Sequence, residues 1–168
     1  MVLPSLYRLD RNTSGIMVLA KHAYGAAALA GKMEKEYVAV CEGFLSGHET
    51  IDQPIGLEPG SKIKRAVCPN GERAITEWNA VRSENGYTLL QVHLKTGRTH
   101  QIRVHMAWLG HPLAGDDLYG GNTSLIARQA LHCKTVSFFH PVQKKAIVLK
   151  SSFPDDFQAL LEHLMLVS

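Results

Sequence analysis

Long apolar stretches are absent from this sequence, and none approaches the roughly 20 residues that a helix needs to cross a lipid bilayer. The N-terminus also lacks the basic segment followed by an apolar segment that is typical of a secretory signal peptide. Both absences argue against a helical membrane protein and against a secreted one. We therefore expect a protein of the cytoplasm.

Cysteine is scarce too, with three residues among 168. Cys41, Cys68 and Cys133 are odd in number, far apart and without a Cys-x-x-Cys pair, so we expect reduced thiols rather than a disulfide framework or a zinc site. The nine histidines include no His-x-x-x-His pair, and the sequence has neither a phosphate-binding loop nor a dinucleotide fingerprint. The sequence thus predicts no metal and no nucleotide cofactor.

Neither sign of charge dominates the whole chain, whose formal net charge is +3. Positive charge is nevertheless concentrated between residues 61 and 105, where eight Lys and Arg stand against three Glu, a net +5 that leaves −2 for the remainder. The densest cluster is Lys62, Lys64 and Arg65. Such a cluster can be a solvated loop or a protected sheet edge. It also suits a polyanionic partner, because clustered Lys and Arg attract phosphates.

The hydrophobic periodicity predicts an α+β fold dominated by an antiparallel, mixed sheet with a few flanking helices, in one domain over residues 1–168. Residues 43–61 are predicted to form a long loop with at most one short strand, and Asn70-Gly71 and Asn85-Gly86 are predicted to form hairpin turns. Strands are expected over residues 16–20, 35–42, 65–68, 74–81, 87–94, 131–139 and 146–151, and helices over residues 22–33, 99–109 and 154–164.

Two polar motifs are the features most informative about function. The first is Arg8-Leu9-Asp10-Arg11-Asn12-Thr13-Ser14-Gly15, in which one carboxylate lies between two guanidinium groups. The second is Thr96-Gly97-Arg98-Thr99-His100-Gln101-Ile102-Arg103-Val104-His105, with Thr99 as the expected N-cap of a helix that presents His100 and Arg103 on one face. A carboxylate in an apolar pocket takes up a proton unless a cation or hydrogen-bond donors hold it ionised. Asp10, flanked by Arg8 and Arg11, therefore has the setting of a carboxylate that is kept ionised for chemistry.

Together with Lys35-Glu36-Tyr37 and Gly110-His111-Pro112-Leu113-Ala114-Gly115-Asp116, these motifs resemble those of the RluA-type pseudouridine synthases. Enzymes of that family isomerise uridine in RNA without a cofactor. The resemblance implies Asp10 as the nucleophile, paired with Arg103, and Tyr37 against the uracil. It implies that Arg8 fills the gap left by a flipped-out base. The further residues expected to contact RNA are Arg98, His100, Lys62, Lys64 and Arg65.

Less specific interpretations of single residues stay open. Asp10 alone could be an ordinary turn residue, and Tyr37 alone could be strand packing. His100 and His105 are expected to orient loops or contact phosphate rather than to act as general bases. Asp116 and Asp117 are expected to cap the loop over residues 111–119 rather than to bind a metal.

The sequence departs from the family pattern in two places. Tyr7 stands where the family usually has histidine, and tyrosine can still stack and donate a hydrogen bond. Family members also normally begin well before this point, with a strand and a Lys-Pro-x-Gly motif. The resemblance therefore implies a truncated chain with an open sheet edge beside Asp10. We expect a monomer, as in the family, or a dimer if a partner supplies the missing strand.

Two other functions compete with that of an RNA uridine isomerase acting on ribosomal or transfer RNA. One is an RNA-binding fragment of the same fold whose catalysis is impaired by truncation. The other is a phosphatase that forms an aspartyl-phosphate at Asp10. That chemistry requires a second carboxylate two residues later, where this chain has Asn12.

Overall fold

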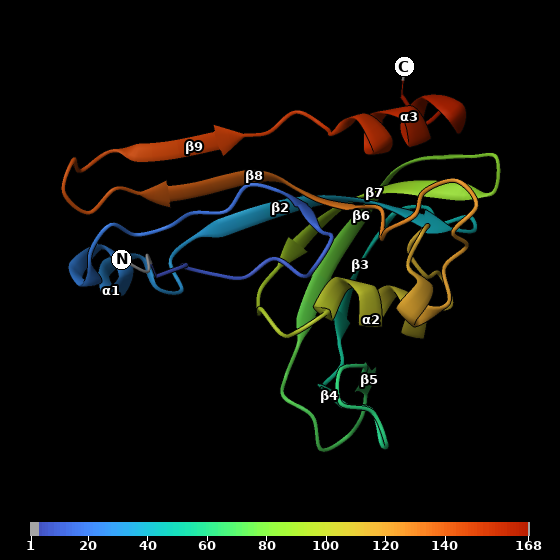
Figure 1. The fold of residues 1–168 in the computed structure, drawn as a ribbon, viewed down its shortest axis with the longest axis horizontal. Helices are drawn as coiled ribbons and strands as arrows, with labels where there is room; N and C mark the ends of the chain where they lie inside the picture. Colours follow the sequence, from blue (N-terminus) through green and yellow to red (C-terminus); the bar gives the residue numbers. More distant parts are fainter. Residues whose placement is uncertain (1–3, 168) are drawn as a thin grey trace.

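The computed structural model describes residues 4–167 and has the predicted α+β architecture, a mixed and mainly antiparallel sheet with helices beside it (Figure 1). The strand order is β1-β8-β2-β7-β6-β3, and β9 pairs with β8. Strand β1 runs parallel to β8, and the other neighbouring strands are antiparallel. The strands of this sheet are Ser14–Gly15 (β1), Glu34–Glu42 (β2), His48–Asp52 (β3), Ile75–Glu84 (β6), Tyr87–Leu94 (β7), Leu131–Phe139 (β8) and Ala146–Lys150 (β9).

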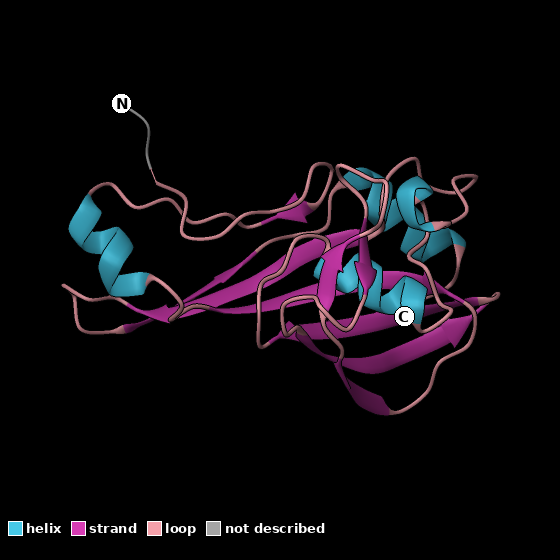
Figure 2. Ribbon diagram, turned by 90° about the horizontal axis from the view of Figure 1, so that it is seen from below, coloured by secondary structure: helices cyan, strands magenta, loops and turns pink. Residues whose placement is uncertain are grey.

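A small second sheet pairs β4 (Ile55–Leu57) with β5 (Arg65–Val67). Helix α1 (Ala23–Leu29) lies at one end of the large sheet, whereas α2 (Gln101–Trp108) and α3 (Asp155–His163) lie toward the other end (Figures 1 and 2). A short 3-10 helix, η1 (Asp117–Tyr119), follows α2.

Strand β2 separates two hydrophobic cores, because successive side chains of a strand point to opposite faces. Tyr37 and Ala39 belong to the core that also contains Ile102 and Met106 of α2. Val38 and Val40 belong to the core that contains Phe157, Leu160 and Leu161 of α3. The strand predicted over residues 35–42 is therefore confirmed with alternating sides, and α2 and α3 cover opposite faces of the sheet.

Several predicted elements are confirmed closely. Strands β7, β8 and β9 and helix α3 fall within a residue or two of their predicted ranges. The Asn85-Gly86 hairpin joins β6 to β7, and both turn residues have positive φ, as a type I′ turn requires.

Other predictions about the N-terminal half are wrong. Asn70-Gly71 does not join two paired strands, because β5 pairs with β4 while β6 pairs with β3 and β7. Gly71 instead packs so tightly on Ile55 that a Cβ would collide with its backbone. The loop predicted over residues 43–61 holds two strands, β3 and β4. Residues 16–20 form no regular strand, since the segment lies at the sheet margin with Met17 and Leu19 about half exposed.

Helix α2 carries the second motif and begins later than expected. The predicted N-cap Thr99 is wrong: His100 occupies that position with a φ of 56° and makes no side-chain cap. The helix is instead fixed at its start by the buried Gln101. The Gln101 amide nitrogen donates to Ile75 O and Thr76 Oγ1, and its oxygen accepts from Thr96 Oγ1 and Arg98 N, at 2.8 to 3.0 Å. One side chain therefore docks both α2 and the loop before it onto β6.

His105 docks the same helix one turn further on. Its Nδ1 lies 2.8 Å from Thr76 Oγ1 and its Nε2 lies 2.9 Å from the carbonyl oxygen of Gln53. The carbonyl can only accept, so Nε2 donates to it and Nδ1 accepts from the threonine hydroxyl. Burial lowers the pKa of His105, in agreement with a neutral ring.

This arrangement predicts a loss of stability in mild acid. The unfolded chain takes up a proton at His105 near the ordinary value of 6.5, whereas the folded protein resists protonation to lower pH. The stabilising contribution is therefore complete above that pH and is lost as pH falls below it. The free energy of unfolding in urea should fall between about pH 7.5 and about pH 5.5, and His105→Gln should flatten this dependence. The matched control is His48→Gln at an exposed site. A pH dependence equally steep in both variants would contradict the assignment.

Candidate active site

Asp10 begins a tight turn in the chain. The backbone N–H of Thr13 donates to the carbonyl oxygen of Asp10 at 3.0 Å, and Asn12 adopts a φ of 69°. Asparagine tolerates this left-handed conformation better than most residues, and a positive φ at the third position is typical of a type II turn. The turn leaves the Asp10 side chain 22% exposed, so the carboxylate is neither free in solvent nor sealed in the core.

A cavity of about 710 Å³ opens beside this turn. It lies between residues 6–13, strand β2 and the segment that leads into α2. The cavity lining includes Arg8, Asp10, Tyr37, Arg65, Arg98 and His100. Six residues selected from the sequence, far apart along the chain, therefore meet at one cavity. Lys62 and Lys64 are not part of its lining.

Arg103 stands behind Asp10 and has two carboxylate partners. Its Nη1 lies 3.8 Å from Asp10 Oδ2, which is an ion pair longer than a hydrogen bond. Its Nε and Nη2 donate to Asp116 Oδ2 and Oδ1, each at 2.8 Å. The guanidinium is 6% exposed and the Asp116 carboxylate is fully buried. Arg103 therefore faces Asp10 as expected, but Asp116 is the partner that fixes its orientation.

This role of Asp116 is not evident from the sequence. The expectation that its side chain caps a loop is wrong, because Asp116 directly precedes η1 and makes no side-chain cap there. Its position is set by Gly115, whose φ is 77° and where a Cβ would collide with carbonyl oxygens of residues 126 and 128. The sequence offers two adjacent aspartates after this glycine, and only the fold decides that Asp116 is buried while Asp117 is exposed.

Tyr119 is a second site residue whose role is not evident from the sequence. The Arg103 guanidinium lies over its ring, 5.0 Å from the centroid. Its hydroxyl accepts a hydrogen bond from Arg65 N at 3.0 Å and lies 2.7 Å from His100 Nδ1. Burial lowers the pKa of His100, which favours a neutral ring whose Nδ1 shares a hydrogen bond with the tyrosine hydroxyl. The Nδ1 side of His100 is thus engaged within the protein.

Tyr37 and Lys35 come from β2 and line the same cavity. Tyr37 is 5% exposed, and burial raises the pKa of its phenol far above the ordinary value. The Lys35 ammonium lies 4.4 Å from the centroid of the Tyr7 ring, and burial lowers its pKa. Tyr7 replaces the usual family histidine and donates to Ile16 O at 2.7 Å. Because burial raises its pKa so far, Tyr37 is a neutral phenol across the physiological pH range.

The basic cluster divides into residues at the cavity and residues outside it. Arg65 lines the cavity, and its buried Nε has no hydrogen-bond partner among residues 4–167. Arg98 also lines the cavity, and its Nε donates to Arg73 O at 2.9 Å. Lys64 lies 3.2 Å from Glu58 in a half-exposed ion pair, and Lys62 is exposed. Arg65 and Arg98 therefore join Arg8, Arg11 and Lys35 as cations that line the cavity.

The part of the chain that the structure describes offers neither a metal site nor a membrane-spanning helix. No group of three or more His, Cys, Asp or Glu residues there could hold a metal ion. Likewise, no helix within residues 4–167 is long and apolar enough to cross a membrane.

Comparison with known proteins agrees with this geometry. The family model described as RNA pseudouridylate synthase matches residues 3–108, which include both motifs. The chain belongs to this family. The resemblance to pseudouridine synthases is thereby confirmed at the level of the family.

Individual relatives support the assignment. The chain is 44% identical over 161 residues to a protein of Bacillus subtilis named uncharacterized RNA pseudouridine synthase YjbO, covering 92% of this chain and 57% of that protein. It is 39% identical to ribosomal large subunit pseudouridine synthase D of Xanthomonas campestris, in an alignment 178 residues long that covers 95% of this chain and 54% of that protein. The chain therefore spans somewhat more than half the length of these relatives.

A solved structure shows the same fold. Human RNA pseudouridylate synthase domain containing 1 superimposes with a TM-score of 0.78 at 23% sequence identity. The match covers 91% of this chain and 70% of that structure. At this identity the likeness concerns the fold, and it agrees with the mixed sheet and flanking helices described above.

Proposed function

We propose that residues 1–168 form a catalytic domain that isomerises uridine to pseudouridine in RNA, with Asp10 as the nucleophile. The observation that carries this proposal is the position of Asp10. Its carboxylate lies at a cavity of about 710 Å³, with the buried guanidinium of Arg103 3.8 Å behind it. The family to which the chain belongs supports the same reaction.

The reaction breaks the bond between N1 of uracil and C1′ of ribose, turns the base and joins C5 to C1′. The proton on C5 leaves, and N1 gains a proton. No electrons are transferred to or from the substrate, so the isomerisation requires no redox cofactor. An ionised carboxylate is the group that this chemistry needs, because it can attack an electron-poor centre.

Arg103 and Asp116 would keep that carboxylate ionised and in place. Asp116 holds two nitrogens of the guanidinium, which leaves Nη1 directed at Asp10. A cation at this distance favours the charged form of a carboxylate. The bidentate contact also prevents the arginine from swinging to solvent, so Asp116 acts on Asp10 through Arg103.

Tyr37 and Arg8 would handle the base and the RNA around it. Tyr37 lies in the cavity wall, where its ring can pack against uracil. Because its phenol keeps its proton, the hydroxyl can donate a hydrogen bond but does not act as a base. Arg8 is exposed at the cavity and is proposed to fill the space that a flipped-out uridine leaves in the RNA stack.

The proposed RNA surface surrounds the cavity. Arg65, Arg98 and His100 would contact the nucleotide that enters it, and Lys62 and Lys64 would contact phosphates further out. Ribosomal RNA is the favoured substrate, because the chain is similar to a ribosomal large subunit pseudouridine synthase; transfer RNA is the alternative. We place this activity in the cytoplasm and in a monomer.

The deciding experiment uses RNA labelled with tritium at C5 of uridine. When C5 becomes bonded to ribose, the label must leave for water, so the purified chain should release tritium from ribosomal RNA. Absence of release from ribosomal and transfer RNA, with a circular dichroism spectrum of a folded α+β protein, would contradict the proposal. RNA binding under those conditions would favour the alternative of a catalytically impaired RNA-binding fragment.

The basic cluster yields a separate prediction about salt. Replacing Lys62, Lys64 and Arg65 together with glutamine should weaken binding to all RNA sequences similarly. The slope of log affinity against log salt should become shallower by about 0.7 to 0.9 for each phosphate contact removed. Filter binding at several salt concentrations measures both effects. Lys145→Gln, at an exposed site just before β9, is the control. An identical slope in the triple variant and the control would mean that the cluster is a solvated loop without phosphate contacts.

A further inference from the structure

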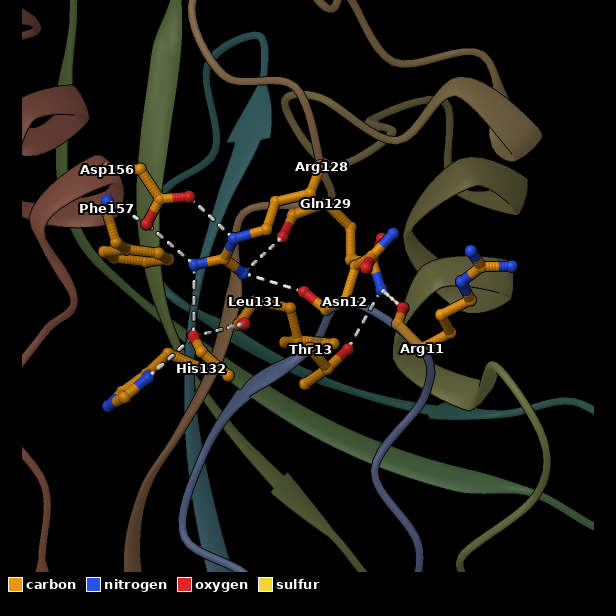
Figure 3. A network of polar contacts seen from close by, with 10 residues as sticks. Arg11, Asn12, Thr13, Arg128, Gln129, Leu131, His132, Asp156 and Phe157 are labelled. Carbon is orange, nitrogen blue, oxygen red and sulfur yellow. Dashed lines mark hydrogen bonds and ion pairs between the residues drawn. The ribbon is translucent and has the colours of Figure 1, made fainter.

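The turn that carries Asp10 is held from behind by two residues that precede β8. Figure 3 shows Arg128 and Gln129 reaching from the end of the preceding loop to the backbone of the turn. Gln129 Nε2 donates to the carbonyl oxygen of Arg11 at 2.7 Å, and Arg128 Nη1 donates to that of Asn12 at 2.9 Å. Each central residue of the turn therefore has its carbonyl bonded to a different side chain.

Gln129 makes the more specific of these contacts. It is 4% exposed, and the same amide nitrogen also donates to Thr13 Oγ1 at 3.1 Å. The Arg11 carbonyl belongs to the central peptide of the turn, and the direction of that peptide distinguishes a type II turn from a type I turn. By holding this carbonyl, Gln129 favours the turn in which Asn12 adopts its left-handed conformation.

Arg128 ties the turn to the opposite face of the sheet. Its Nε and Nη2 donate to the two carboxylate oxygens of Asp156 at 2.7 and 3.0 Å, and Nη2 also lies 3.2 Å from Ser14 Oγ (Figure 3). Asp156 is in the first turn of α3, and the contact with Arg128 holds the pKa of its carboxyl below the ordinary value. Helix α3 is thereby linked to the backbone of the turn through one guanidinium.

We infer that Gln129 and Arg128 are positioning residues for Asp10, acting through the backbone of residues 11–14 and not through contact with RNA. Neither residue lines the cavity. The inference rests on the proposed function for its kinetic consequence. A small displacement of a reacting group can cost up to about 100-fold in rate. Loss of the Gln129 contacts should therefore lower kcat and leave RNA affinity nearly unchanged.

The test compares Gln129→Leu, Gln129→Glu and the control Gln158→Glu, which makes the same chemical change on α3 away from the turn. Gln129→Leu should lower kcat for tritium release by about 10- to 100-fold, with the Kd for RNA changed by less than about threefold. In Gln129→Glu, the ionised carboxylate cannot donate to the Arg11 carbonyl, whereas the protonated carboxyl can. Its kcat relative to wild type should therefore rise as pH is lowered, because burial favours the protonated form. A merely structural loss would not produce this pH profile.

Hydrogen exchange gives a readout that does not depend on catalysis. The Thr13 amide is bonded to the carbonyl of Asp10, so it should exchange faster in Gln129→Leu than in wild type or in the control. If Gln129→Leu does not fold, Arg128→Lys replaces it, since lysine cannot reach Asp156, Asn12 and Ser14 together and the Thr13 amide should again exchange faster.

The outcomes separate the two proposals. If the wild-type chain releases no tritium, the proposed function fails, and the exchange rate of Thr13 still decides whether these residues hold the turn. A kcat equal to that of wild type in Gln129→Leu, or in Arg128→Lys where that variant replaces it, would overturn the positioning role. An unchanged exchange rate of the Thr13 amide in the same variant would also overturn it. Reduced kcat with faster exchange at Thr13 would support it.

Discussion

Replacing Asp10 with asparagine is expected to reduce tritium release by at least about 10⁴-fold, because the amide has the same shape but cannot serve as the nucleophile. RNA affinity should change by less than about threefold, since the substitution removes no phosphate contact. The fold should be retained, because Arg103 keeps its two short hydrogen bonds to Asp116. Release assays and filter binding measure the two effects separately.

The matched control for this substitution is Asp117→Asn. Asp117 lies in η1 with an exposed side chain, so the same loss of one negative charge occurs outside the cavity. Its turnover should equal that of wild type. If Asp10→Asn lost RNA binding in step with activity, Asp10 would have a structural role in the turn, and the proposed nucleophile would be wrong.

The largest effect on stability is expected at the buried pair of Arg103 and Asp116. Arg103→Met leaves a fully buried carboxylate without its cation, which costs about 3 to 5 kcal/mol of unfolding free energy, as does breaking one side of other buried ion pairs. The same variant removes the cation beside Asp10, so activity should fall as well. Arg103→Lys should rescue both properties only in part, because an ammonium cannot make the bidentate contact.

A double variant separates the two roles of Arg103. Arg103→Met combined with Asp116→Leu removes both buried charges, and such apolar replacements of a buried pair are often neutral for stability. The double variant should therefore recover most of the unfolding free energy lost in Arg103→Met. Tritium release should stay low, because Asp10 still has no cation beside it. Urea unfolding and single-turnover release measure the two quantities. Recovery of activity together with stability would mean that Arg103 contributes to the stability of the fold and not to catalysis.

Local patterns in the sequence were sufficient for those parts of the fold that depend on neighbouring residues. The alternation along residues 34–42 determined which side chains of β2 face each core, because the side-chain period of a strand is two whatever the partner strands are. Asn85-Gly86 determined the hairpin between β6 and β7, because both residues accept a positive φ at low cost. The expected pairing of Asp10 with Arg103 came from the resemblance to the pseudouridine synthases rather than from a local pattern, and the structure places the two charged groups 3.8 Å apart.

Only the tertiary structure decided which strands and charges became partners over long distances. Residues 65–67 pair with β4 rather than with β6, because the packing of Gly71 against Ile55 brings those segments together and no local pattern records that contact. The partner that fixes Arg103 is Asp116 because one of two adjacent aspartates is buried behind the cavity. The support of the Asp10 turn by Gln129 joins residues separated by more than a hundred positions. A single sequence specifies periodicity and turn chemistry, whereas burial and ion pairing depend on the closed fold, since both depend on which groups exclude water from one another.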